Sequence, residues 1–195
     1  MAPNKKTLNQ ALSILREAAK LGHVDIESVN ILSREIFTDS MISHIGNYKA
    51  YCDFLTRPKI GFHIRMDGND FGNINKKYGF EIGNEAIILL GNTIRESMND
   101  SVGIKHGKVF RIGGDEFHAF VPSLKDAIRF IKNIRHNLKK IVFMNNDFLL
   151  SLSIGVGINP TQAEFSLINA KNIKKERNCE IGKSETYSFF IDYQL

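Results

Sequence analysis

Two short apolar runs separated by a pair of glycines constrain the fold of this chain more than any other feature. Val109 to Ile112 and Phe117 to Val121 each have the pattern of a short strand, and Gly113-Gly114 stands between them. Because glycine permits positive φ in a tight turn, the segment predicts a β-hairpin. Gly-Gly turns also occur in many ordinary hairpins, so the turn alone assigns no function.

The sequence around this hairpin alternates between strand and helix patterns. Further strands are expected at residues 60–66, 148–158 and 187–192. Helices are expected at residues 42–54, in a Gly- and Asn-rich segment that ends near Tyr78, and at residues 84–98, 123–138 and 163–177. This order predicts an α/β (α+β) fold, in which helices flank a central, mostly antiparallel mixed sheet.

Two of these helices have predicted starts and predicted inner faces. Asn84 is a favoured N-cap after a loop over Gly79 to Gly83, and Ser123 is the expected cap of the helix that follows the hairpin. The apolar face of the first of these helices is formed by Ile87, Leu90, Ile94 and Met98. The inner face of the second is formed by Ala127, Ile128, Ile131, Ile134 and Leu138.

The N-terminal segment predicts two short amphipathic helices, at residues 6–22 and 25–37. In the second, Ile26, Val29 and Ile31 belong to an apolar stripe at helical spacing. Such a stripe either packs on the rest of the chain or makes a contact with a second copy or another partner. We expect residues 1–39 to form a helical extension and residues 40–195 to form one catalytic-size domain.

Composition excludes several classes of protein. The 195 residues are 43% hydrophobic, which suffices for one core. The net charge of +5 suits an anionic partner, but no nucleic-acid motif accompanies it, so we expect a small phosphate-bearing ligand and no nucleic acid. No run of about 18 apolar residues and no signal peptide is evident, so the expected location is cytoplasmic, without a membrane partner.

Cysteine and histidine offer no metal pattern. Cys52 and Cys179 do not form a CxxC pair, so neither a disulfide framework nor a thiolate zinc site is indicated. The six histidines are not clustered at metal-ligand spacing, and His118 alone lies near the hairpin turn. We expect structural roles for them and no zinc.

Carboxylates stand at the ends of two strands that are expected to be neighbours. Asp67 follows the first core strand, and Asp115-Glu116 follows the glycine pair. Carboxylate oxygens are the ligands that Mg²⁺ prefers, and Mg²⁺ in turn neutralises phosphates. Glycines in the turn let backbone N–H groups approach a phosphate closely. The pattern therefore predicts a magnesium-nucleotide site at this end of the sheet.

Arg111 to Phe117, with the sequence RIGGDEF, resembles the signature of the GGDEF family, the bacterial diguanylate cyclases. Residues 67–84 match the family pattern DxDxFKxxNDxxGHxxGD without a gap. Residues 153–156 are similar to its SIGV strand, and residues 43–47 are a faded version of its TGLxN segment. The resemblance covers about residues 40–192.

This resemblance implies a palm-like sheet and a reaction between two subunits. Each subunit of a homodimer, formed at least transiently, would hold one nucleoside triphosphate, and each 3′-hydroxyl would attack the α-phosphate of the other. The product would be a cyclic dinucleotide, with GTP as the expected substrate. The implied cofactor is Mg²⁺ or Mn²⁺.

The resemblance also assigns roles by position. Asp67, Asp115 and Glu116 would be the catalytic residues, with Asp67, Asp115 and the carbonyl of Gly68 as metal ligands. Glu116 would assist either the metal or the attacking hydroxyl. The implied substrate-binding residues are Phe71, Asn75, Asn84, Gly113, Gly114, Lys171 and Arg177, the last two in a segment two residues longer than the family's AKxxGRN.

Four departures from the family pattern bear on substrate and regulation. Asn84 replaces an Asp that can accept both guanine donors, and an amide cannot satisfy both. Gly72 replaces a Lys near the phosphates, and Asn69 replaces the second acid of DxD. The family's inhibitory RxxD motif is absent from residues 104–107, so product feedback through it is not expected.

Three functions follow from these observations. The first is an active cyclase that uses GTP, or adenine nucleotides because of Asn84. The second is a catalytically degenerate domain that binds a nucleotide or a protein partner. The third, a cyclic-oligonucleotide synthase related to polymerase palms, is less favoured because its turn is GGDD, whereas Glu116-Phe117 follows here.

Overall fold

A five-stranded sheet forms the centre of the fold, and the computed structural model describes the chain over residues 5–103, 106–177 and 186–190. The strands lie in the order β2-β3-β1-β4-β5, with only β4 and β5 parallel, which confirms the predicted mostly antiparallel mixed sheet. The end of the last expected strand, after Phe190, falls outside the described residues. The strand bounds are β1 (Phe62–Gly68), β2 (Lys108–Arg111), β3 (Glu116–Val121), β4 (Leu152–Gly157) and β5 (Tyr187–Phe190).

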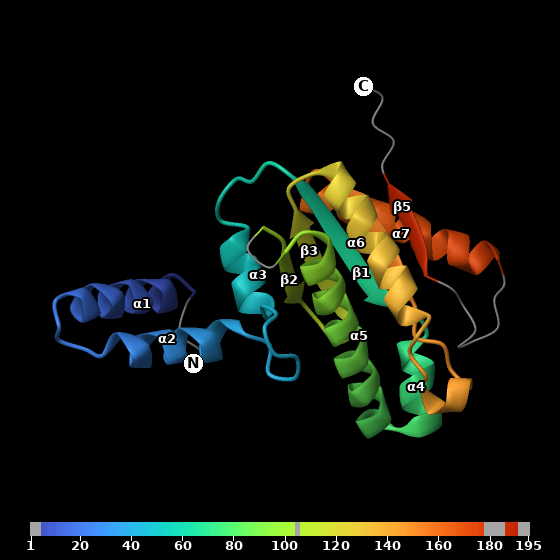
Figure 1. Cartoon of the computed structure of the whole chain (residues 1–195), viewed down its shortest axis with the longest axis horizontal. Coiled ribbons are helices and arrows are strands. Elements are labelled where there is room, and N and C mark those ends of the chain that lie inside the picture. Colours follow the sequence, from blue (N-terminus) through green and yellow to red (C-terminus); the bar gives the residue numbers. More distant parts are fainter. Residues whose placement is uncertain (1–4, 104–105, 178–185, 191–195) are drawn as a thin grey trace.

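Helices cover both faces of this sheet. Figure 1 shows α5 and α6 in front of the strands and α7 behind them. Within the described residues, none of the helices has the length and apolar character needed to cross a bilayer. The helix bounds are α1 (Lys5–Lys20), α2 (Ile26–Phe37), α3 (Tyr48–Phe54), α4 (Phe71–Tyr78), α5 (Phe80–Ser101), α6 (Leu124–Leu138) and α7 (Pro160–Glu176), with a 3₁₀ turn at Met144–Asn146.

The main core lies between the sheet and the pair α5 and α6. Side chains of β1 alternate between the two faces, and Ile64 and Met66 are fully buried on the core face. Arg65 and Asp67 face α7 on the other side. The predicted inner face of α5 is confirmed, because Ile87, Leu90, Ile94 and Met98 are all buried.

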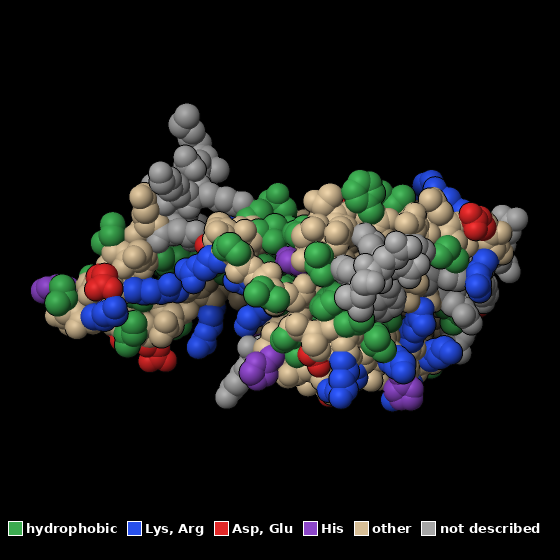
Figure 2. Space-filling view, turned by 90° about the horizontal axis from the view of Figure 1, so that it is seen from above, with side chains coloured by type: hydrophobic (Ala, Val, Ile, Leu, Met, Phe, Trp, Pro, Cys, Tyr) green, Lys and Arg blue, Asp and Glu red, His purple; other side chains and the backbone are tan. Residues whose placement is uncertain are grey.

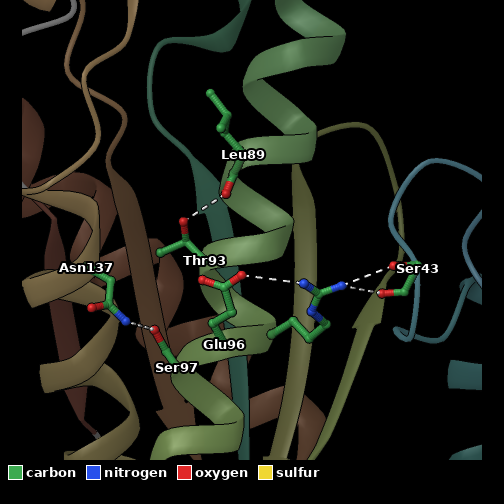
Figure 3. Close-up of polar contacts among 7 residues, drawn as sticks. Ser43, Leu89, Thr93, Glu96, Ser97 and Asn137 are labelled. Carbon is green, nitrogen blue, oxygen red and sulfur yellow. Dashed lines mark hydrogen bonds and ion pairs between the residues drawn. The ribbon is translucent and has the colours of Figure 1, made fainter.

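The predictions for α6 hold except at one position. Ser123 caps the helix, with its Oγ accepting a hydrogen bond from the backbone N of Asp126 at 3.2 Å. Ile128, predicted on the inner face, is 40% exposed, and Phe130 is buried in the core instead. Polar contacts also join α6 to α5, as in the bond from Asn137 Nδ2 to Ser97 Oγ at 3.2 Å (Figure 3).

The start of α5 differs from the prediction. The helix begins at Phe80, and Gly79, with φ of +87°, connects it directly to α4. Glycine adopts this left-handed conformation at little steric cost, so two helices can meet without the predicted loop. Asn84 therefore lies inside the helix, and the predicted N-cap role is wrong.

Two other predicted elements are shorter in the structure. Asn47 caps α3 by accepting a hydrogen bond from Ala50 N at 3.1 Å, so this helix begins at Tyr48 and not at residue 42. β4 begins at Leu152 and not at residue 148, because residues 148–151, which follow the 3₁₀ turn, form a bend and an irregular segment. In both cases, apolar residues that the sequence pattern assigned to a helix or a strand belong instead to a loop that packs on the core.

The N-terminal helices α1 and α2 form a hairpin that stands apart from the sheet and its helices (Figure 1). Leu12 and Val29 are buried, at 3% and 2% exposure. The predicted stripe on α2 is only partly buried, because Ile26 and Ile31 are about half exposed. Figure 2 shows hydrophobic side chains on the surface of this hairpin, and the exposed ones are Ile14, Leu21, Ile26, Ile31 and Leu32.

Candidate functional site

The predicted carboxylates meet at one end of the sheet. Asp67, near the end of β1, lies directly opposite Glu116, the first residue of β3. Asp115 precedes Glu116, and its carbonyl oxygen accepts a hydrogen bond from Gly68 N at 3.1 Å. The antiparallel pairing of β1 and β3 thus brings together acids that are almost 50 residues apart in the sequence.

Asp115 lies in an environment that disfavours its negative charge. Burial raises the pKa of the Asp115 carboxyl, and the neighbouring Asp67 carboxylate raises it further. A bound divalent cation reverses this effect, because it stabilises both carboxylates at once. The pair therefore has the electrostatic character of a cation site.

Two lysines of α7 face these acids. Lys171 Nζ lies 2.7 Å from Asp67 Oδ2, and Lys174 Nζ lies 2.6 Å from Asp70 Oδ1. The sequence predicted Lys171 at the site but not Lys174, whose side chain is only 19% exposed. Its spacing of three residues from Lys171 on a helix was the available signal.

Arg177, also predicted to bind phosphate, lies farther along the same helix. It is the C-cap of α7, six residues beyond Lys171, and its side chain is exposed. At the rise of an α-helix this offset is about 9 Å. The structure therefore places Lys171 and Lys174 at the acids and Arg177 beyond them.

The acids and lysines line opposite walls of one pocket of about 540 Å³. Its size and mixed charge suit a phosphate-bearing ligand accompanied by a cation. The walls are formed by the end of β1 and the loop after it on one side, and by α7 on the other. The lining residues are Asp67, Gly68, Asn69, Asp70, Lys171, Lys174 and Lys175.

Phe71 supports this pocket from beneath and does not line it. Its ring is 5% exposed and belongs to the hydrophobic core. A Cβ atom at Gly68 would lie 2.6 Å from this ring and 3.1 Å from Asp115 Cβ. Gly68 is therefore required by packing, in addition to the predicted role of its carbonyl.

The glycine turn is wider than the sequence suggested. Ile112 N donates to Glu116 O at 2.9 Å, so three residues form the turn. Neither Gly113 nor Gly114 uses the positive φ that glycine permits. A Cβ at Gly114 would meet no described atom within 4 Å. Glycine is thus not demanded there by the fold, which favours the other reason for it, the close approach of a ligand.

Arg111 fixes the turn from the side. Its Nε donates to the carbonyl oxygen of Gly114 at 2.9 Å, and its Nη1 lies 3.6 Å from Asp39 Oδ2. Asp39 in turn accepts hydrogen bonds from the backbone N of Met41 and of Ile42, each at 2.9 Å. The segment that follows α2 is therefore tied to the signature turn.

Asn75, one of the predicted base contacts, lies against the residue that precedes Asn84, the other one, near the junction of α4 and α5. Asn75 Oδ1 packs directly on Gly83, and a Cβ atom at Gly83 would collide with it. Asn84 is the next residue of α5 and is exposed. Because Asn84 does not cap its helix, the main structural explanation for an amide at this position no longer applies.

Asn69, which replaces an acid of the family pattern, is hydrogen-bonded to two serines, one just before β4 and one within it. Its side chain is 4% exposed. Asn69 Nδ2 donates to Ser151 Oγ at 2.9 Å, and Asn69 Oδ1 accepts from Ser153 Oγ at 2.8 Å. An amide supplies both a donor and an acceptor here, whereas a carboxylate would only accept.

The donor set fits a single magnesium ion. Among the described residues, no three or more His, Cys, Asp or Glu side chains form a group that could hold a metal. The site instead offers Asp67, Asp115 and the carbonyl of Gly68. Mg²⁺ is commonly held by one or two carboxylates together with waters and substrate phosphates, so these oxygens suffice.

Two histidines lie buried on the same face of the sheet, away from the pocket. His63 Nδ1 and His118 Nε2 are 3.0 Å apart, and the ring of Tyr51 lies 4.6 Å from that of His118. Burial lowers the pKa of His63 to about 4 and lowers the pKa of His118 well below its ordinary value. Both rings are therefore neutral at pH 7.

Comparison with known proteins agrees with this site. The family model described as "Diguanylate cyclase, GGDEF domain" matches residues 53–175. The chain is 24% identical over 159 residues to a probable diguanylate cyclase, DgcI of Escherichia coli K12, covering 78% of this chain and 34% of DgcI. It is 30% identical over 137 residues to the uncharacterized protein YhcK of Bacillus subtilis, covering 63% and 37%. The chain thus spans about a third of the length of these relatives.

Solved structures of similar fold cover almost the whole chain. One is the diguanylate cyclase SiaD of Pseudomonas aeruginosa in complex with its activator SiaC, with a TM-score of 0.64, 17% identity, and coverage of 95% of this chain and 73% of SiaD. Another is the coiled coil and GGDEF domain of DgcB from Caulobacter crescentus in complex with c-di-GMP, with a TM-score of 0.58, 17% identity, and coverage of 94% and 99%. At these identities the likeness shows the fold.

Proposed function

The chain belongs to the GGDEF family, and from this premise we propose that it is a nucleotidyltransferase that condenses two nucleoside triphosphates into a cyclic dinucleotide. The observation that carries the proposal is that Asp67, the electrostatic neighbour of Asp115, faces Lys171 in one pocket. Acids for a cation and a lysine for phosphates are the groups that phosphoryl transfer requires. Cytoplasmic location belongs to the same proposal.

Magnesium, or manganese, would be held by Asp67, Asp115 and the Gly68 carbonyl, and when bound it neutralises charge on the phosphates and on the leaving pyrophosphate. Lys171 and Lys174 approach the same pocket from α7 and orient the phosphate oxygens. At the turn of Gly113 and Gly114 the phosphates approach the backbone closely. Arg111 holds this turn in place by donating a hydrogen bond to the Gly114 carbonyl oxygen.

In the proposed reaction, the 3′-hydroxyl oxygen of one nucleotide bonds to the α-phosphorus of the other, and pyrophosphate leaves. Two such steps close the ring and release two pyrophosphates. Because one chain presents one pocket with these acids, two chains must meet, at least transiently, for both steps. Glu116, beside Asp67, either adds an oxygen ligand to the metal or accepts the proton of the attacking hydroxyl.

The base is the least constrained part of the substrate. GTP is the expected substrate, with Asn75 and Asn84 at the base. Since the Asn84 amide offers one acceptor and one donor, it cannot satisfy both guanine donors. A mismatch of this kind costs about 1 to 3 kcal/mol. This is enough to change the preference between guanine and adenine nucleotides tenfold or more, so that adenine nucleotides also become substrates.

A binding module without turnover is the second candidate. Its motivation is the replacement of the family's Lys by Gly72, which is exposed and removes one cation near the phosphates. In that case the pocket would bind nucleotide, and the chain would act through a protein partner.

The deciding experiment incubates the purified protein with Mg²⁺ and GTP, ATP or both, and identifies products by mass spectrometry. We expect a cyclic dinucleotide from the wild type and none from Asp115→Ala. Asp100→Ala, which removes an exposed carboxylate of α5, is the matched control and should behave as the wild type. Nucleotide binding without product from any mixture would support the binding module and reject the enzyme.

A further inference from the structure

Arg65 is a cation within the central strand of the sheet. It lies in the middle of β1, two residues before Asp67 and on the same face, and its side chain is 14% exposed. A charge so nearly buried is stable only when it is paired and hydrogen-bonded. The partners of this guanidinium therefore indicate what it is for.

Both partners are carboxylates, and one of them belongs to the signature turn. Arg65 Nε donates to Glu164 Oε2 on α7 at 2.7 Å. Arg65 Nη2 lies 3.6 Å from Glu116 Oε2 on β3. The guanidinium thus bridges the element that carries the pocket lysines and the strand that carries the signature acids.

The bridge determines the direction in which Glu116 points. Glu116 is paired with Asp67 in the β1–β3 register, and two carboxylates directly opposite each other repel. The position opposite Arg65 on β4 is Gly155, which has no side chain and leaves room for α7 and for Glu164. The Oε2 atom of Glu116 therefore lies between Arg65 and the glycine turn, 3.6 Å from Arg65 Nη2 and 3.3 Å from where a Cβ atom at Gly113 would be.

The other position that could hold a second metal is also neutral. Asn69 carries no charge, and both ends of its amide are used by Ser151 and Ser153. With Glu116 held by Arg65 and Asp70 paired with Lys174, the carboxylates of Asp67 and Asp115 remain for a metal. This agrees with the finding that no group of three metal-binding side chains forms within the described part of the chain.

We propose that Arg65 is a positioning residue that keeps Glu116 out of the metal coordination and reserves it for the attacking hydroxyl, so that the site binds one divalent ion. The role of Glu116 in this inference rests on the proposed reaction. The number of metal ions and the identity of their ligands do not rest on the proposed reaction, because both can be measured without turnover.

The main test measures Mn²⁺ affinity from the electron paramagnetic resonance signal of free Mn²⁺, with the ion alone and with a non-hydrolysable nucleoside triphosphate analogue. Glu116→Gln should bind Mn²⁺ within about twofold of the wild type. Asp67→Asn and Asp115→Asn should each bind it about tenfold or more weakly. Because the Glu116 side chain is 45% exposed, its substitution leaves the fold in place. A tenfold loss in Glu116→Gln would overturn the proposal.

A second test releases Glu116 by changing Arg65. Arg65→Gln should acquire a second Mn²⁺ per chain and lose turnover, whereas Arg65→Lys, which keeps the positive charge, should retain a single Mn²⁺ and most of the turnover. Arg95→Gln, which removes an arginine paired with Glu96 on α5, is the matched control and should change neither. Two Mn²⁺ ions in the wild type would contradict the assignment.

These measurements separate the two proposals. A wild type that forms no product contradicts the proposed reaction and leaves the Mn²⁺ result standing. A Glu116→Gln variant with weakened Mn²⁺ binding contradicts the role of Arg65, even if the wild type is an active cyclase.

Discussion

At the scale of single residues, two glycines of the site are present for different reasons. A Cβ atom at Gly68 would lie 2.6 Å from the ring of Phe71, so the fold itself excludes a side chain there. A Cβ atom at Gly114 would meet no described atom within 4 Å, and its φ is not in the left-handed region. The difference separates a glycine that packing requires from one that we propose serves a ligand.

Alanine substitution should reveal this difference. Gly114→Ala should change the free energy of unfolding by less than about 0.5 kcal/mol, since its surroundings are open. It should weaken nucleotide binding by about tenfold, because a methyl group then obstructs the phosphates. Gly68→Ala should destabilise the fold by about 1 to 3 kcal/mol. Urea unfolding and equilibrium nucleotide titration measure the two effects, and equal nucleotide affinity of Gly114→Ala and wild type would refute the ligand role.

The buried histidines predict how stability depends on pH. The pKa of His63 is about 4 in the folded chain and about 6.5 when unfolded, so the unfolded state takes up its proton first. Stability should therefore be greatest above about pH 6.5 and fall as the pH decreases from 6.5 toward 4, by up to about 3 kcal/mol from this residue.

Urea unfolding at several pH values between 7.5 and 4.5 measures this effect. Because carboxylates also titrate at the lower end, the informative quantity is the difference between the wild type and His63→Gln. The variant should lose stability less steeply over the same range. Parallel curves for the two proteins would show that His63 takes up its proton at the same pH in the folded and the unfolded chain.

At the scale of elements, α7 is held to the sheet along one charged face. Its acidic and basic side chains pair with successive positions of β1 and the loop that follows it. Two glycines of β4 let the helix lie close, since a Cβ atom at Gly155 would collide with Leu167 N and one at Gly157 would lie 2.5 Å from Ala163 N. The three pairs are Glu164–Arg65, Lys171–Asp67 and Lys174–Asp70.

Two substitutions of glycine by alanine should have opposite effects on the free energy of unfolding. Gly155→Ala should lower the free energy of unfolding by about 1 to 3 kcal/mol, because the new methyl group pushes α7 off β4. Gly72→Ala, in an exposed position of α4 with no described atom within 4 Å of its Cβ, should raise it by about 0.5 to 1 kcal/mol. Urea unfolding compares them, and destabilisation by Gly72→Ala would contradict this account.

Local patterns predicted those parts of the elements that depend on neighbouring residues. The hairpin strands, the cap at Ser123 and the buried face of α5 all follow from periodicity and capping. The start of α5 did not, because Gly79 resembles a loop residue and its φ of +87° instead joins two helices. Lys174 and the partners of Asn69 were missed because their contacts lie 80 or more residues away in the sequence.

At the scale of the whole molecule, the division between residues 1–39 and 40–195 remains a prediction. The α1–α2 hairpin stands apart from the sheet in Figure 1, and its exposed apolar residues make no large contact with it. The chain just after the hairpin is different, since Asn47 Nδ2 donates to Ile36 O at 2.8 Å and Asp39 reaches Arg111. The boundary of an independent unit should therefore lie shortly before Ile36.

A chain that starts at Glu35 should fold without the hairpin. It keeps the contacts of Ile36 and Asp39, so its urea transition should remain cooperative, with an extrapolated free energy of unfolding within about 15% of that of the full chain, which is the error of the extrapolation. Sedimentation of both chains at equal concentration shows whether the exposed stripe joins two copies. A non-cooperative transition in the shortened chain would place the hairpin within the same folding unit.

The ion pair between Lys174 and Asp70 spans 104 positions of the sequence. A ribosome that makes this stretch adds Asp67 and Asp70 about 100 residues before it adds Lys171 and Lys174. Until α7 has emerged and docked, the newborn protein has acids at its sheet end without the cations that face them. The pocket is therefore complete only after the whole stretch from β1 to α7 has been made and folded.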